Sequence, residues 1–176
     1  MGIWKNPIDE SVRNIGAKQM KRVFEMMISL AHIVVIGLGD YRLKNCVEKN
    51  IPWKKRFPVF GGWGEMQKYH NYGAFLNMGD KSPGLVGAVS IFLFIMASGV
   101  FLLTFTMKGK YILKMGLSLL LGGAFSNTYD RMYRHYVVDY LSFPKCKQIQ
   151  RIVFNISDFC IMAGAMLIAL SDMKEK

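Results

Sequence analysis

Four long stretches of the chain are dominated by hydrophobic residues and are separated by charged ones. They run over residues 23–39, 82–107, 115–129 and 152–171. Each reaches or approaches the ~20 residues that an α-helix needs to cross the hydrocarbon core of a bilayer. The third gains length if the Lys114 side chain extends its charge to the interface. The pattern predicts an all-α membrane protein with four transmembrane helices, which places both termini on one side.

The residues before the first stretch mix polar and apolar types. Asn6 can cap a helix that begins at Pro7. The apolar residues that share one face of this helix are Ile8, Val12 and Ile15. We expect an interfacial helix over residues 1–22, with a frayed tail as the alternative, then a membrane domain over 23–172 and a cytoplasmic tail over 173–176. The apolar run lacks the position and the cleavage site of a secretory signal peptide.

The composition supports a membrane protein. Of the 176 residues, 52% are hydrophobic and 20% are charged, and the mean hydropathy is +0.20, whereas a soluble domain carries about 25% charged residues. The net charge is +11, but the Lys and Arg residues form no continuous basic face, so lipid headgroups fit as partners better than nucleic acid. Cys46, Cys146 and Cys160 lack metal-ligand spacing and are interpreted as free thiols.

The positive charges set the expected orientation. Ten of the 23 Lys and Arg residues lie on the side of the termini and 13 on the other, so the total count does not decide. The positive-inside rule applies to short loops, and the short basic turn Lys108–Lys110 and the N-terminal cluster therefore carry more weight. We expect both termini in the cytoplasm and residues 41–81 outside. The aromatic, Pro and Gly residues of 41–81 predict a small β element at the headgroup level.

Ionisable residues inside the apolar stretches are the candidates for chemistry, because charge is costly at membrane depth. Asp158 lies in the fourth stretch, and Asn155 precedes it by three residues, which places both on one helical face. The same spacing recurs at Asn127 and Asp130, near the end of the third stretch. If two such faces meet, a pair of carboxyl groups can share one proton and hydrolyse amides without a metal or cofactor. A structural carboxyl group at Asp158 is the alternative.

Other chemistries lack their residues. The three histidines are scattered, and neither a His-Glu-x-x-His nor a Gly-x-Ser-x-Gly segment occurs, so zinc and serine hydrolases are not indicated. A proton-coupled transporter built on Asp158 would need a polar face along the rest of the fourth stretch. Residues 159–170 supply only small or apolar residues beside Cys160.

Five segments resemble the lipoprotein signal peptidase family, the bacterial signal peptidase II. Three strong matches follow the family's order: Gly122–Arg131, Val137–Tyr140 and Phe154–Asp158. The separation of 19 residues between Asp139 and Asp158 is typical of the family. Two weaker matches lie upstream: Gly39–Lys44 and His70–Phe75. The resemblance covers roughly residues 24–172.

The resemblance implies an intramembrane aspartyl endopeptidase without a cofactor. Its substrate would be a prolipoprotein whose cysteine carries diacylglycerol, cut on the amino side of that cysteine. The protein would be a monomer of the bacterial cytoplasmic membrane with its active site near the extracytoplasmic face, and globomycin would inhibit it. A non-catalytic binder of lipidated segments shares every motif and stays open as the alternative.

The resemblance also implies roles for particular residues. Asp139 and Asp158 would form the catalytic dyad, and Asp130 would brace the loop after the third crossing. The residues that would position the dyad or the substrate backbone are Asn127, Arg131 and Asn155. The residues that would shape the substrate pocket and the outer β element are Asp40, Lys44 and Asn71.

Four residues depart from the family pattern. Tyr41 stands where Gln is usual, and Arg42 and Leu43 replace an apolar–Thr pair before Lys44. These changes bear on the choice of substrate and favour a client-restricted paralogue as a further alternative. Ser157 stands where Ala is usual, and we expect its hydroxyl to hydrogen-bond a carboxylate oxygen.

Overall fold

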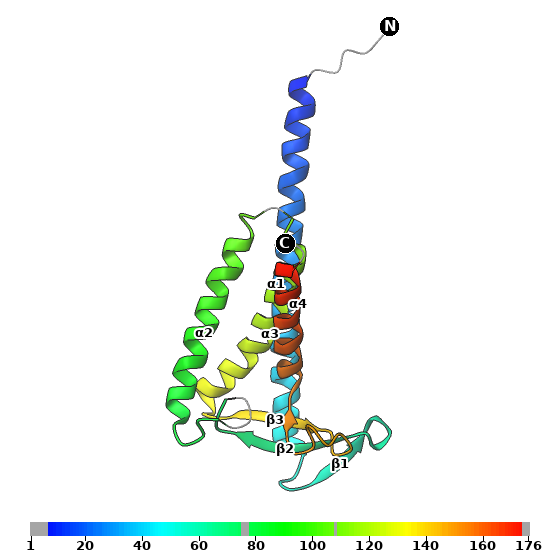
Figure 1. The fold of residues 1–176 in the computed structure, drawn as a ribbon, viewed down its shortest axis with the longest axis vertical. Helices are drawn as coiled ribbons and strands as arrows, with labels where there is room; N and C mark the ends of the chain where they lie inside the picture. The colour runs from blue at the N-terminus through cyan, green and yellow to red at the C-terminus, as the bar shows by residue number, and fades with distance from the viewer. Residues whose placement is uncertain (1–6, 75–77, 108, 174–176) are drawn as a thin grey trace.

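The computed structural model describes residues 7–74, 78–107 and 109–173, with the backbone alone for 7–15. Within these residues the helices are α1 (Pro7–Asn50), α2 (Pro83–Thr104), α3 (Tyr111–Tyr133), α4 (Ile156–Met173) and the short 3-10 helix η1 (Phe60–Gly62) (Figure 1). The strands are β1 (Arg56–Val59), β2 (Gly64–Asn71), β3 (Val137–Ser142) and β4 (Val153–Phe154). The sheet lies across one end of the helices.

Three helices of the described part of the chain are long and apolar enough to cross a membrane. They are α2, α4 and, within α1, Gly16–Asn50. Helix α3 is as long as α2, but Lys114 near its start and the polar residues near its end make it less apolar. The structure thus confirms a mostly helical membrane protein with a small antiparallel sheet.

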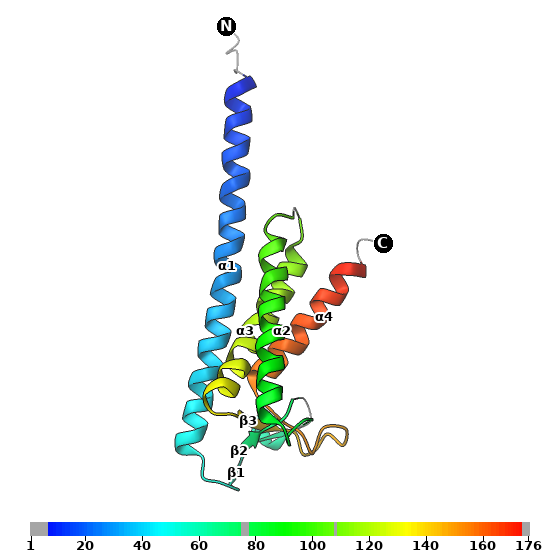
Figure 2. The ribbon, with the colours of Figure 1, turned by 90° about the vertical axis from the view of Figure 1, so that its left-hand side faces the viewer.

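Helix α1 differs from the prediction at both ends. The helix predicted before the first crossing does begin at Pro7, but it is not a separate element, because the backbone is helical without a break from Pro7 to Asn50; the expected cap, Asn6, lies outside the described residues. No proline interrupts residues 8–51, and the Lys, Gln, Met and Arg residues after Gly16 favour a helix. A helix of 44 residues is about 66 Å long, so its first turns project beyond the other helices (Figure 2).

The opposite end of α1 also extends further than expected. The sequence predicted that the outer segment begins at residue 41, but the helix continues to Asn50. Val47 and Ile51 are buried against β3, where they contact a cluster of Val138, Tyr140 and Leu141. The β element therefore begins only at Arg56, and the last turns of α1 support it.

The four strands form an antiparallel sheet in the order β1-β2-β3-β4. In β2 an irregularity between Met66 and Tyr69 sets one extra residue against β3, so that Tyr69 pairs with Asp139. Asn71 lies two residues further along β2, on the same face of the sheet as Tyr69. Its side chain can therefore reach Asp139 diagonally across the two strands.

Helices α3 and α4 approach closely because glycines face the partner's backbone. A Cβ atom at Gly164 would lie 2.5 Å from the Gly116 carbonyl oxygen, and one at Gly123 would collide with the Ser157 carbonyl oxygen. Small residues allow this kind of backbone contact between membrane helices. The contact at Gly123 holds the first turn of α4 against α3.

Candidate active site

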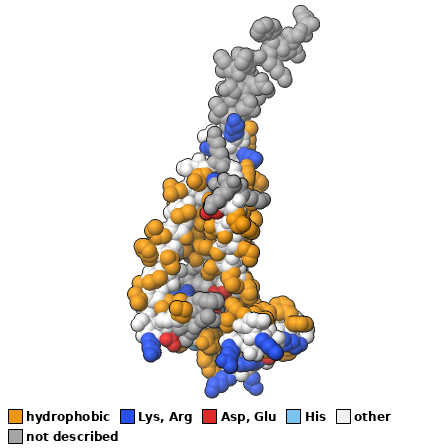
Figure 3. All heavy atoms as spheres, in the orientation of Figure 1, with side chains coloured by type: hydrophobic (Ala, Val, Ile, Leu, Met, Phe, Trp, Pro, Cys, Tyr) orange, Lys and Arg blue, Asp and Glu red, His pale blue; other side chains and the backbone are white. Residues whose placement is uncertain are grey.

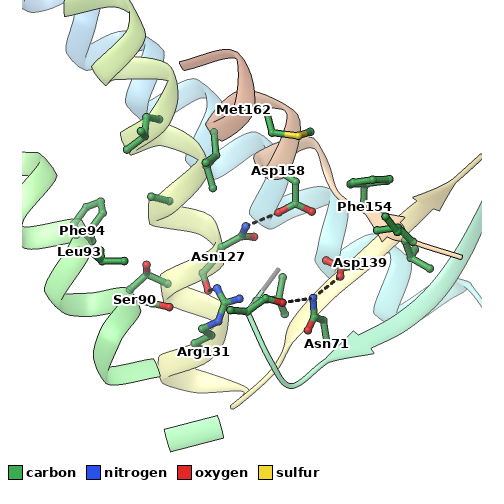
Figure 4. A pocket seen from close by; sticks show the side chains of 18 of the residues that line it. Asn71, Ser90, Leu93, Phe94, Asn127, Arg131, Asp139, Phe154, Asp158 and Met162 are labelled. Atoms are coloured by element: carbon green, nitrogen blue, oxygen red, sulfur yellow. Dashed lines mark hydrogen bonds between the residues drawn. The ribbon is translucent and has the colours of Figure 1, made fainter. Parts of the chain in front are cut away.

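A cavity of about 650 Å³ lies between α2, α3, α4 and the sheet (Figure 4). Most of its wall is apolar, with Leu93 and Phe94 of α2 and Met162 of α4 among the lining residues. The acidic, amide and basic side chains that line it are Asn71, Asn127, Arg131, Asp139, Arg151 and Asp158. A cavity of this size can hold an extended apolar ligand and present a few polar groups to it.

Asp139 is the cavity-lining carboxyl group on the sheet, and its residue is only 2% exposed. Its two oxygens accept hydrogen bonds from Asn71 Nδ2 at 3.1 Å and from Asn155 Nδ2 at 2.7 Å. Burial raises the pKa of Asp139 to about 7, and the nearby Asp158 carboxylate adds to this, against the effect of the two amide donors. This carboxyl group can therefore carry a proton at neutral pH.

Asp158 lies at the third position of α4 and exchanges hydrogen bonds with the residue before the helix. The Asp158 N–H donates to Asn155 Oδ1 at 2.9 Å, and the Asn155 N–H donates to Asp158 Oδ2 at 3.0 Å. This reciprocal pattern is a capping box, which satisfies free N–H groups at a helix start. Asn127 Nδ2 donates to the other carboxylate oxygen at 2.9 Å (Figure 4). The Asp158 carboxylate is therefore held on both of its oxygens.

Two asparagines connect the two carboxyl groups. Asn155 Nδ2, fully buried, donates to Asn127 Oδ1 at 3.3 Å as well as to Asp139. Lys44 Nζ donates to the same Asn127 oxygen at 2.7 Å. Because this oxygen accepts two hydrogen bonds, the Asn127 amide nitrogen is oriented toward Asp158. A continuous chain of hydrogen bonds thus joins Asp139 to Asp158.

Lys44 and Asp40 lie behind this chain rather than in the cavity wall. Both side chains are fully buried, and Lys44 Nζ lies 3.0 Å from Asp40 Oδ2 and 3.2 Å from Asp130 Oδ2. A buried charge needs a partner and further hydrogen bonds, and Lys44 has both. The expectation that Asp40 and Lys44 shape the pocket is thus not met directly, because their nearest contact with the cavity passes through Asn127.

Tyr140 is a site residue that the sequence analysis missed. Its hydroxyl donates to Asp40 Oδ1 at 2.6 Å and accepts the N–H of Ile156 at 3.1 Å, which ties β3 to α1 and to the start of α4. A buried tyrosine needs a partner for its hydroxyl, which is the signal that could have identified it. Ser157 does hydrogen-bond a carboxylate, but the acceptor is Asp40 at 2.5 Å, not its neighbour Asp158.

The two Asn-x-x-Asp segments meet through their asparagines, whereas Asp130 faces away from the cavity. Asp130 accepts the Val138 N–H at 3.2 Å and lies 3.2 Å from Arg134 Nε, at the turn that leads into β3. Asp130 is therefore not paired with Asp158, contrary to the idea that the repeated spacing joins these two carboxyl groups.

Arg131 lines the cavity one position after Asp130. Its Nη2 donates to the Gly73 carbonyl at 3.0 Å, and its Nη1 donates to the Asn127 carbonyl at 3.4 Å. The buried Nε atom has no hydrogen-bond partner within the described part of the chain. The guanidinium group is thus fixed in the cavity wall by two backbone carbonyls, one on α3 and one after β2.

The residues that depart from the family pattern around position 41 lie outside the cavity wall. The Tyr41 ring instead contacts the Tyr129 ring edge-on, with 5.1 Å between centroids, and Leu43 is exposed. These departures consequently do not alter the surface that would meet a substrate in the cavity.

Comparisons of the sequence with known proteins point to the same family that the sequence motifs resemble. The family model described as signal peptidase (SPase) II matches residues 30–174. A lipoprotein signal peptidase of Streptomyces griseus is 30% identical over 169 residues, which are 91% of this chain and 79% of that protein. One from Nitratidesulfovibrio vulgaris is 31% identical over 155 residues, 80% of this chain and 90% of that protein.

A solved structure shows the same fold. It is described as a bacterial membrane enzyme structure by the in meso method at 2.3 Å resolution, and it superposes with a TM-score of 0.72 at 21% identity. The match covers 84% of this chain and 88% of that one.

Proposed function

The chain belongs to the signal peptidase II family and is a peptidase that removes signal peptides from prolipoproteins; we propose that it acts as an aspartic endopeptidase with Asp139 and Asp158 as its catalytic pair. The observation that carries this proposal is that both carboxyl groups line one cavity and are joined through Asn127 and Asn155. Such a pair performs acid and base catalysis without a metal.

Within this pair we assign the resting proton to Asp139. Burial and the neighbouring carboxylate raise the pKa of Asp139 to about 7, so its protonated form is populated at neutral pH. Asp158 lies in the first turn of α4, where the partial positive charge of the helix start and the donors of Asn127 and Asn155 stabilise a negative carboxylate.

The proposed reaction begins with water held between the two carboxyl groups. Asp158 removes a proton from this water, and the water oxygen attacks the carbonyl carbon of the scissile bond. At the same time Asp139 donates its proton to the carbonyl oxygen. The product of this step is a neutral tetrahedral diol without a covalent bond to the enzyme. Asp158 then protonates the leaving nitrogen while Asp139 takes back a hydroxyl proton, so the C–N bond breaks and the dyad is restored.

The cavity suits a lipidated substrate. We propose that the diacylglyceryl group of a modified cysteine lies against the apolar residues of α2 and α4, with the peptide bond on its amino side at the dyad. Arg131, which lines the cavity, would position the substrate backbone, and Asn71 would hold Asp139 in place. Globomycin-like inhibitors would occupy the same space.

We propose that α3 also crosses the membrane, which brings the number of crossings to four. Lys114 near its start is paired with Glu25 at 3.0 Å. Both termini would then lie in the cytoplasm and the sheet outside, which puts the dyad near the extracytoplasmic face. A cysteine-accessibility experiment on single-cysteine variants at Cys46 and Cys146, both exposed, would test this orientation.

The catalytic proposal is tested by mass spectrometry of a synthetic diacylglyceryl-cysteine prolipoprotein incubated with the purified protein. We expect a cut directly before the lipidated cysteine, and its loss in Asp139→Asn and in Asp158→Asn. Asp172→Asn, at an exposed position near the end of α4, is the matched control and should retain activity. Intact substrate with folded wild-type protein would favour the non-catalytic binder, and an active dyad variant would contradict the assignment.

A further inference from the structure

The sheet carries a projecting surface that the catalytic proposal does not use. We call it the outer lobe and define it as residues 52–65, which contain β1 and η1, together with the loop 143–152 between β3 and β4. The two parts are in contact, since Lys145 Nζ lies 5.4 Å from the centre of the Trp63 ring. The lobe extends sideways from one end of the helices (Figure 1).

The outer lobe exposes a row of aromatic side chains. The most exposed are Trp63 at 68% and Phe60 at 66%, and Trp53 and Phe57 are also about half exposed. Phe60 adopts a φ of +52°, a left-handed conformation that bulky residues seldom take. Strained backbone conformations of this kind cluster at functional sites, and here the strain holds an apolar ring outward.

The charge of the outer lobe is almost entirely positive. Its exposed basic residues are Lys54, Lys55, Arg56, Lys145, Lys147 and Arg151. The sequence has no Asp or Glu in residues 52–64 or 143–152, and Glu65 pairs with Arg56 at 3.3 Å. Figure 3 shows hydrophobic side chains along the upper side of this lobe, next to the helices, with Lys and Arg side chains below and around them.

We propose that the outer lobe docks on anionic phospholipid headgroups of the bilayer that surrounds the helices. The lobe lies beside the ends of membrane-crossing helices, so the headgroup layer is the surface next to it. Aromatic side chains are favoured at the membrane interface, and nearby Lys and Arg side chains are attracted by anionic lipids. An acidic soluble protein matches the charge of the lobe but not its exposed apolar rings.

Docking has a consequence for the cavity. Arg151 belongs to the outer lobe and also lines the cavity. A headgroup bound near Arg151 would therefore lie at the edge of the cavity that Asp139 and Asp158 also line. The inference itself requires only membrane insertion, so it stands or falls independently of the catalytic dyad.

Trp fluorescence can test the docking, because the chain has only three Trp residues. In a Trp4→Phe background the signal comes from Trp53 and Trp63. The protein is placed in nanodiscs of phosphatidylcholine, with or without phosphatidylglycerol, that contain a headgroup-attached nitroxide quencher. We expect stronger quenching with phosphatidylglycerol, and loss of this gain at high salt, since salt screens exposed charges.

Charge-removal variants complete the experiment. Replacing four lobe lysines, Lys54→Gln, Lys55→Gln, Lys145→Gln and Lys147→Gln, should abolish the gain caused by phosphatidylglycerol. Lys18→Gln with Arg22→Gln, at exposed positions near the opposite end of α1, is the control and should leave it unchanged. Quenching that is equal in both lipids, or that the four lobe substitutions do not alter, would overturn the proposal.

Discussion

Asn155 and Asp158 cap each other at the start of α4, with hydrogen bonds of 2.9 and 3.0 Å between each side chain and the other's backbone N–H. The same Asn155 side chain donates to Asp139 at 2.7 Å. One residue therefore ends a loop, begins a helix and sets the position of both carboxyl groups.

Asn155→Ala should remove both the cap of α4 and the amide that donates to Asp139, and lower activity strongly. We expect turnover to fall by about 100-fold, because a misplacement of ~1 Å costs about that much, and stability to fall by ~1 kcal/mol for the lost N-cap. Asn155→Ser is the informative comparison, since its hydroxyl can cap α4 but cannot replace the amide that donates to Asp139. The cleavage assay and thermal unfolding in detergent should show stability recovered in Asn155→Ser and turnover still low. Equal activity in all three proteins would contradict the positioning role.

The pH dependence of cleavage should report the proton on Asp139. Because its pKa is raised to about 7, the proton needed by the carbonyl oxygen is lost as the pH rises through 7, and activity should decline there. Infrared spectroscopy should show a protonated carboxyl band at pH 6 that disappears in Asp139→Asn. A rate that stays constant well above neutral pH would contradict this assignment.

Asp139 should also make the free energy of unfolding depend on pH. The direction is opposite to that expected for a carboxylate in an ion pair, whose pKa is lowered by folding. Its folded pKa lies above the unfolded value of about 3.9, so the stabilising contribution is complete below about pH 4 and is lost as the pH rises through 7. Asp139→Asn removes the titrating group, and its free energy of unfolding should vary less between these pH values. Unfolding experiments in detergent at several pH values measure the difference.

Ser157→Ala should leave cleavage nearly unchanged. The Ser157 hydroxyl donates to Asp40, not to Asp158, and Asp40 keeps its contacts with Lys44, Ser126 and Tyr140. We expect turnover within about two-fold of wild type and a loss of ~1.5–3 kcal/mol in stability from one hydrogen bond to a charged group. A large loss of activity with normal stability would show that Ser157 acts on the dyad directly.

Gly123→Ala should disturb the site from outside the cavity. A Cβ atom there collides with the Ser157 carbonyl oxygen, so the first turn of α4 must move and Asp158 with it. We expect a loss of about 1–3 kcal/mol in stability and a clear loss of turnover. Gly99→Ala is the control, because nothing lies within 4 Å of its Cβ position and Ala favours a helix. Similar behaviour of the two variants would exclude tight packing at Gly123 as the cause.

Local sequence features predicted much of the architecture. Long apolar stretches bounded by charges predicted the helices, and the Pro, Gly and aromatic residues after the first helix predicted strands. The spacing of Asn155 and Asp158 indicated that they act together, although the relation is a cap rather than a shared helical face. These features depend on neighbours within one or two turns, which the sequence displays directly.

Other relationships were decided by tertiary structure. The sequence indicated neither that α1 continues past Asp40, where burial of Val47 and Ile51 against β3 stabilises the extra turns, nor that Asp130 turns toward Lys44 and Arg134. Tyr140 acquires its partner Asp40 from a position 100 residues earlier. A buried charge or hydroxyl takes whichever partner the packing brings near, and that choice is made by long-range contacts rather than by spacing along the chain.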